Sequence, residues 1–181
     1  FTMNLSDLNE FRIHIGRVTS IKEVMQDGLF PPFISYKHML DFGYALNIFY
    51  GCLTTYIPIA ISLFTDTSAM AIKIFTLGTV IFSGITMYVF TYRITKSKVA
   101  STISALVYMA GPYKYTDIYS RNAVGEYTAF IFIPMVFIGI YDLLNNEKRG
   151  NKWLIAGASL LILSHTITTI YTAIFALFFI G

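Results

Sequence analysis

"IFTLGTVIFSGITMYVFTY", residues 74–92, decides the fold class. These nineteen residues carry no charge, and a helix needs about 20 predominantly apolar residues to cross a bilayer. The whole chain is similarly apolar: 55% of its 181 residues are hydrophobic, 13% are charged, and its mean hydropathy is +0.62. A soluble domain carries about 25% charged residues. The sequence therefore predicts an integral membrane protein.

Further apolar stretches predict an all-α, polytopic helical membrane protein. Transmembrane helices are expected at about 74–92, 99–113, 127–144 and 153–180. The last of these comprises two apolar blocks interrupted by His165. The sequence begins with Phe rather than Met and stops inside an apolar run, so we expect a segment of a longer chain.

The basic residues predict how these helices are oriented. Two basic loops, 93–98 and 148–152, should face the cytoplasm. The 113–126 loop then lies on the extracytoplasmic side. Residues 42–64 are long enough to cross, but their Gly, Pro, Asn and Tyr content favours a segment along or dipping into the outer surface. With that interpretation, residues 1–70 form a long first extracytoplasmic loop, in the same compartment as 113–126.

Charge and cysteine content exclude several classes. A net charge of +3 without a concentrated basic face gives no footprint for nucleic acid. The single cysteine, Cys52, excludes an intrachain disulfide and a cysteine-based metal site. The sequence contains no GxGxxG, P-loop, GxSxG or HExxH pattern, so ATP-driven chemistry and soluble hydrolase mechanisms have no support.

The first region predicts an amphipathic helix with a polar face of candidate residues. Apolar positions from Phe11 to Met25 recur every three and four residues. Glu10, His14 and Arg17 follow at i, i+4 and i+7, on one helical face. Such a trio binds a divalent metal or an anionic group, or abstracts a proton; the alternative is a solvated polar face. Asp7 fits either interpretation.

The predicted outer loop supplies the second candidate group. Asp117 and Arg121 stand at i and i+4 and either pair simply with each other or take part in binding. Glu126 directly precedes an apolar run, where an ionisable side chain is a functional candidate by default. Tyr113, Tyr115 and Tyr119 fit an interfacial aromatic belt. His165 is either a neutral buried histidine bonded to a neighbouring hydroxyl, or a metal ligand or proton shuttle.

Three blocks resemble a known family. "EFRIHIGRVTSIKEVMQDGLFPPFIS" (10–35), continued by "DFGYALNIFYGCLTTYIPIAISLF" (41–64), resembles the first extracytoplasmic loop of bacterial multi-pass membrane proteins of the YfhO type. It also resembles their relatives described as 6-pyruvoyl-tetrahydropterin synthase-related membrane proteins. "YMAGPYKYTDIYSRNAVGEYTAFIFIPMVFIGIYDLL" (108–144) resembles their second outer loop and next span, and "LLILSHTITTI" (160–170) their Ser-His element.

These families are similar to the GT-C glycosyltransferases, which implies a function and a location. Such enzymes transfer a sugar from a polyprenyl-phosphate carrier to an extracytoplasmic acceptor, at the outer face of the bacterial cell membrane. Their first outer loop holds membrane-parallel helices. The expected partners are the lipid bilayer, the carrier-linked sugar and an acceptor in the cell envelope.

The resemblance also assigns roles to residues. Glu10, or alternatively Asp7, takes the position of the acidic residue in the first loop, a candidate catalytic base or metal ligand, and His14 and Arg17 follow it. Arg121 and Asp117 join them as substrate-binding residues, with Arg17 or Arg121 holding the phosphate. Glu126 and His165 are the candidate ligands of a divalent cation, Mg or Mn rather than Zn. Two departures stand out: the acid is more often Asp than Glu, and Tyr50-Gly51 replaces the usual Tyr-Pro.

Two alternatives to an enzyme remain open from the sequence. The same charged groups would serve a transporter or flippase for a lipid-linked substrate, which binds a headgroup without turnover. In a structural subunit of a membrane complex, the charged loops would contact partner proteins. A transporter places ionisable groups near the bilayer midplane, whereas the charges here gather at one face, which favours the enzyme.

Overall fold

Every regular element of the described residues is helical, which confirms the predicted all-α class. The computed structural model describes residues 9–29, 34, 43, 45 and 51–180. Within them the elements are α1 (Asn9–Gln26), α3 (Leu53–Ser62), α4 (Ser68–Thr95), α5 (Lys98–Met109), α6 (Pro112–Thr116), the π-helical turn η2 (Asp117–Arg121), α7 (Val124–Leu144), α8 (Gly150–Ile162) and α9 (Thr166–Ile180).

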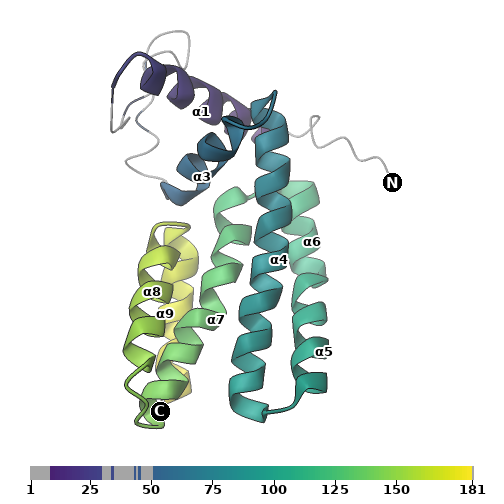
Figure 1. Ribbon diagram of the computed structural model, residues 1–181, viewed down its shortest axis with the longest axis vertical. Helices are drawn as coiled ribbons and strands as arrows, with labels where there is room; N and C mark the ends of the chain where they lie inside the picture. Colours follow the sequence, from purple (N-terminus) through teal and green to yellow (C-terminus); the bar gives the residue numbers. More distant parts are fainter. Residues whose placement is uncertain (1–8, 30–33, 35–42, 44, 46–50, 181) are drawn as a thin grey trace.

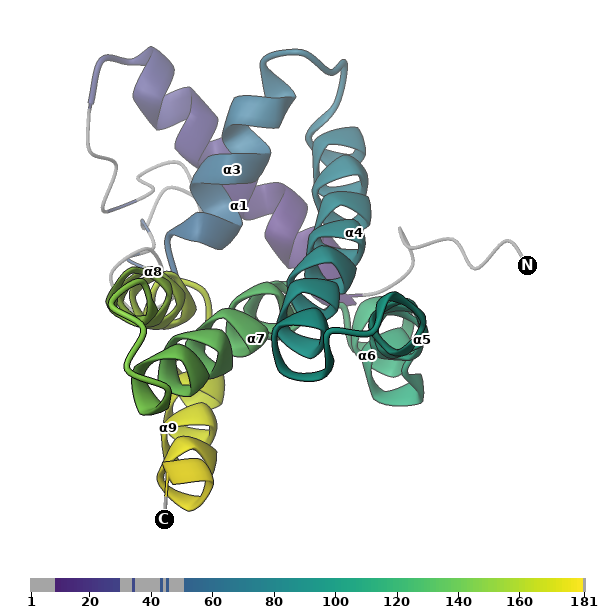
Figure 2. The same cartoon turned by 60° about the horizontal axis from the view of Figure 1, so that its bottom comes forward.

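The long helices form an up-and-down bundle (Figure 1). α4 and α7 are long and apolar enough to cross a membrane, judged by length and composition. They contain the predicted spans 74–92 and 127–144. α7 contacts both α4 and α8, and Figure 2 shows it between these two helices. The chain therefore has two helices that support a membrane location, while a full multi-pass topology stays a prediction.

The 153–180 segment differs from the expected single helix. It is divided into α8 and α9 by a turn at Leu163–His165, and α9 contacts both α7 and α8 (Figure 1). The main chain entering α3 packs directly on this turn, where the Leu53 amide donates to the Leu163 carbonyl at 3.3 Å. Polar residues at the turn supply the break: Ser164 and His165 interrupt two apolar runs, and the Ser164 hydroxyl donates to the Leu161 carbonyl.

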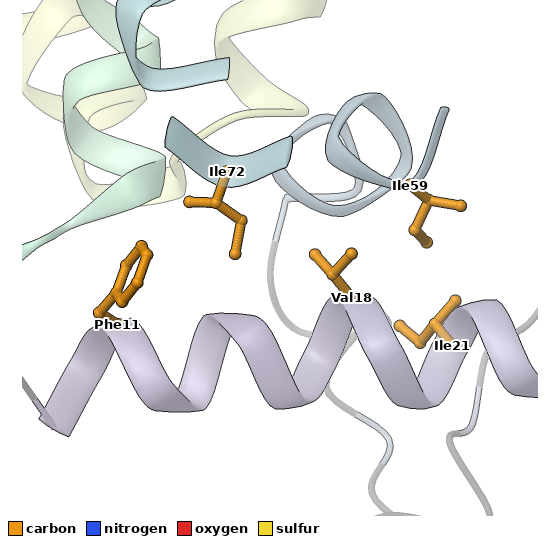
Figure 3. Close-up of a cluster of buried hydrophobic side chains, with 5 residues drawn as sticks. All are labelled: Phe11, Val18, Ile21, Ile59 and Ile72. Atoms are coloured by element: carbon orange, nitrogen blue, oxygen red, sulfur yellow. The ribbon is translucent and has the colours of Figure 1, made fainter. Parts of the chain in front are cut away.

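α1 lies transverse to the long helices, at the end of the bundle where α4 and α7 begin (Figure 1). Its predicted apolar face is confirmed. Phe11, Val18 and Ile21 are buried against Ile59 of α3 and Ile72 of α4 (Figure 3). The apolar face of α1 is thus covered by protein. On its polar face, His14 hydrogen-bonds the backbone of Asn122, in the segment between α5 and α7.

Candidate functional site

The 113–126 segment is a compact turn built from helical pieces. Gly111 and Pro112 start α6, since proline suits the first position of a helix. The chain then widens into η2. π-helical turns are rare in proteins, and many of those known lie at functional sites. Asn122 ends the turn with a φ of 50°, a left-handed conformation that asparagine adopts more readily than most residues. The reversal at Asn122 brings η2 and the first turn of α7 together.

Four side chains meet at this turn, and we call them the Arg121 cluster: Tyr113, Asp117, Arg121 and Glu126. Arg121 Nη1 lies 3.1 Å from Asp117 Oδ1 and 3.1 Å from Glu126 Oε2. The same nitrogen donates to the Tyr113 hydroxyl at 3.4 Å, and that hydroxyl donates to Glu126 Oε1. Asp117 and Arg121, which stand at i and i+4, do pair in the structure, while their predicted part in substrate binding stays a prediction. One guanidinium therefore joins two carboxylates and a phenol.

Burial differs sharply within the Arg121 cluster. The Asp117 side chain is 0% exposed, Glu126 is 17% exposed and Arg121 is 52% exposed. Burial and the neighbouring Glu126 carboxylate raise the pKa of Asp117 to about 7. A carboxyl group with such a pKa exchanges protons near neutral pH, as a general acid or base must. The cluster thus combines a half-exposed cation with a proton-exchanging carboxyl group behind it.

α1 brings the first candidate group to the same place. The His14 ring hydrogen-bonds the backbone of Asn122, and the charge of Glu10 acts on Asp117. Burial, reinforced by the charge of Arg17, lowers the pKa of His14 to about 4. His14 is therefore neutral at pH 7. The candidate residues Glu10 and His14 of α1 therefore lie close to the 113–126 segment, although the two are far apart in the sequence.

Arg17 has a different position from the one its spacing suggests. It is 3% exposed, and its Nη2 donates to Thr55 Oγ1 of α3 at 2.6 Å. Its Nη1 lies 3.3 Å from His14 Nδ1. Arg17 thus ties α1 to α3 and orients His14, whereas Arg121 offers a guanidinium at the surface. Asp7, the alternative acid, lies outside the described residues.

His165 lies near the Arg121 cluster, in the turn between α8 and α9. The charges of Glu126 and Arg121 both act on its imidazole. Its Nδ1 lies 2.7 Å from Thr168 Oγ1, so the hydroxyl-bonded arrangement is the one observed.

The sequence predicts Glu126 and His165 as ligands of a divalent cation. Both Glu126 oxygens already bind protein groups, and no three His, Cys, Asp or Glu side chains in the described part of the chain cluster closely enough to hold a metal ion. The Mg or Mn expected at Glu126 and His165 stays a prediction.

Sequence reasoning missed two contributors to this site. Tyr113 was assigned only to an aromatic belt, yet its hydroxyl connects Arg121 to Glu126. Its spacing could have revealed it, because residues 113, 117 and 121 stand four apart and so share a helical face. Asn122 carried no signal of its own, because its contribution is a backbone conformation and a backbone hydrogen bond.

Comparisons with known proteins add one relative. No family model matches the chain, and no solved structure matches it. It is 28% identical over 177 residues to an uncharacterized protein of Lactococcus lactis subsp. cremoris (strain MG1363). The match covers 95% of this chain and 29% of that protein, so the chain spans less than a third of the relative's length.

Proposed function

We propose that this chain is part of a membrane glycosyltransferase of the GT-C type, which transfers a sugar from a polyprenyl-phosphate carrier to an extracytoplasmic acceptor. The observation that carries the proposal is the Arg121 cluster: two carboxylates joined by a half-exposed guanidinium, where two membrane-length helices begin. A lipid-linked phosphate and a hydroxyl acceptor meet at such a boundary between membrane and water. The same cluster supplies a cation for the phosphate and a base for the hydroxyl.

Arg121 is the group that holds the carrier phosphate in this proposal. A guanidinium suits phosphate because its planar array of N–H donors makes paired hydrogen bonds. Half of the Arg121 side chain faces outward, so a phosphate can reach it while Asp117 and Glu126 hold it in place. Arg17, buried against Thr55, positions α1 instead.

The acceptor proton goes to the carboxylates. The acceptor hydroxyl oxygen attacks the anomeric carbon, and the bond from that carbon to the carrier phosphate oxygen breaks with its electron pair on the phosphate. Glu126, the more exposed carboxylate, takes the hydroxyl proton, and Asp117 behind it exchanges protons near pH 7. Glu10 is exposed and acts on Asp117, so it is the second candidate for this base.

The test is transfer of labelled sugar from polyprenyl-phosphate donors, in membranes that contain the full-length protein. Glu126→Gln, Glu10→Gln and Arg121→Lys are compared at equal protein levels. The control is Glu147→Gln, an exposed acid between α7 and α8, which should leave transfer unchanged. Removal of a general base should lower the rate about 10²–10⁴-fold.

The outcomes separate the possible functions. A loss of transfer in Glu126→Gln with only a small change in Glu10→Gln identifies Glu126 as the base, and the reverse identifies Glu10. Arg121→Lys should weaken carrier binding, because lysine makes no paired contact. Carrier binding without turnover in the unmutated protein, across a broad panel of sugars, would replace the enzyme with a transporter.

A further inference from the structure

Lys114 is a buried cation that the proposed reaction does not use. It is 3% exposed, although it lies only seven residues before the half-exposed Arg121. Its ammonium group donates to the Ser83 hydroxyl of α4. The same nitrogen lies 5.5 Å from the ring centroid of Tyr108 and 5.6 Å from that of Phe130, within reach of cation–π attraction.

No carboxylate in the described part of the chain pairs with this ammonium group. Asp117 and Glu126 pair with Arg121. Among the described residues, the ammonium group of Lys114 contacts only the Ser83 hydroxyl and two aromatic rings. A charge at this depth is expensive unless an opposite charge accompanies it. Ser83 lies in the middle part of α4, and Phe130 lies within α7. Lys114 therefore reaches in among the membrane-length helices without an anion.

A cavity of about 350 Å³ adjoins Lys114. Its apolar wall includes Met87 of α4, Val107 and Tyr108 of α5, and Phe130 of α7. Val107 is 66% exposed, so the cavity opens on the outer side of α5, where lipid chains would lie. The volume is within the range of roughly 300–1,000 Å³ that is typical of ligand pockets. Lys114 is the one charged residue among those that line this apolar cavity, so the cavity suits an amphiphile with one negative charge.

We propose that this pocket binds an anionic phospholipid of the bilayer, with Lys114 contacting the phosphate and the apolar wall holding an acyl chain. Two features favour this occupant. Bilayer phospholipids surround the opening, and the single charge of a phosphodiester matches the single charge of Lys114. Tyr113 lines the same cavity and also bonds Glu126. A bound lipid would therefore support the wall that separates the pocket from the Arg121 cluster. The proposed lipid binding does not require that the chain transfers a sugar.

The experiment measures lipid retained by the purified full-length protein, by native mass spectrometry from detergent. Dioleoylphosphatidylglycerol is compared with dioleoylphosphatidylcholine, which has the same chains and no net charge. We expect the unmutated protein to prefer the anionic lipid about tenfold, as one charge-assisted hydrogen bond predicts. Lys114→Gln should remove that preference. Lys73→Gln, which changes an exposed lysine of α4, should keep it.

A second variant guards against a folding defect in Lys114→Gln. Val107→Trp places a large side chain at the exposed opening of the cavity, away from the charge, and should reduce retention of both lipids. Equal retention of the two lipids by the unmutated protein, or an unchanged preference in Lys114→Gln, would overturn the proposal. So would displacement of the anionic phospholipid by an equimolar amount of undecaprenyl phosphate, because the pocket would then belong to the carrier.

Discussion

Arg93 Nη1 and Asp142 Oδ2 lie 2.7 Å apart and join α4 to α7, far from the Arg121 cluster. The Asp142 side chain is 2% exposed and Arg93 is 16% exposed. Arg149 approaches the same oxygen at 3.5 Å. The pair fixes the C-terminal ends of the two membrane-length helices relative to each other, so it helps to set where their other ends place the Arg121 cluster.

Asp142→Ala should destabilise the protein strongly. It leaves Arg93 partly buried without its carboxylate, and breaking a buried pair costs about 3–5 kcal/mol. Thermal unfolding in detergent measures the effect. Glu147→Ala is the matched control, because its side chain is 52% exposed and its pair with Arg149 is a surface pair, which is worth about 0–1 kcal/mol. Equal losses in the two variants would contradict the special role of Asp142.

Much of the fold could be predicted because it follows from patterns along the chain. The uncharged run 74–92 lies within α4, and the three- and four-residue spacing of Phe11, Val18 and Ile21 gives the buried face of α1. The turn that divides 153–180 was not predicted. Apolar length alone cannot distinguish one long helix from two short ones when the break consists only of Ser164 and His165.

The candidate site was predictable in its residues and much less in its geometry. Glu10, Asp117, Arg121 and Glu126 stood out because charges are rare in an apolar chain, and the structure brings them to one place. Spacing could not show that Arg17 faces α3, because that depends on how α1 packs. Nor could it show that Asp117 is fully buried while Arg121, one turn away, is half exposed.

Asp117 should make stability depend on pH. Its pKa is about 7 in the folded protein, against a usual value of 3.8. The folded state therefore holds a proton between pH 4 and 7 that the unfolded state has released. This stabilisation is complete below the unfolded pKa and is lost as the pH rises through 7, at up to about 1.4 kcal/mol per pH unit. Relative to Asp117→Asn, the unmutated protein should lose stability from pH 4 to 7 and change little above it.

The measurement is the unfolding midpoint of both proteins over that pH range. A difference between them that does not change with pH would show that Asp117 keeps an ordinary pKa. Glu147→Gln, at a side chain that is 52% exposed, again serves as the control.

His14 should change the stability of the fold with pH in the opposite direction to Asp117, over an overlapping pH range. Its pKa is about 4 in the folded protein, below its usual value of 6.5. The contribution of His14 to stability is present above pH 6.5 and is lost as the pH falls toward 4. In this range the imidazole binds a proton in the unfolded state and not in the folded state. The contributions of His14 and Asp117 therefore oppose each other between pH 4 and 6.5.

This opposition gives a distinctive result for His14→Gln. Glutamine can bond both the Asn122 backbone and Arg17, so the fold should be kept. The stability of the variant should fall more steeply from pH 4 to 6.5 than that of the unmutated protein, because only Asp117 then acts. If the two profiles run parallel, the imidazole of His14 titrates in the folded protein as it does in solvent.

Gly51, two residues before α3, should be intolerant of any side chain. A Cβ there would lie 2.3 Å from the Leu163 carbonyl oxygen and 2.3 Å from that of Ser164. Both are backbone atoms, so Gly51→Ala must push the start of α3 away from the turn that carries His165. We expect a loss of about 1–3 kcal/mol, as for other overpacked sites.

Gly78→Ala is the control, since a Cβ at Gly78 meets nothing within 4 Å and alanine favours the helix by about 0.5–1 kcal/mol. Unfolding midpoints should therefore fall for Gly51→Ala and hold or rise for Gly78→Ala. An unchanged midpoint in Gly51→Ala would mean that α3 does not pack on the α8–α9 turn, and His165 would then lose the backbone support that holds it near the Arg121 cluster.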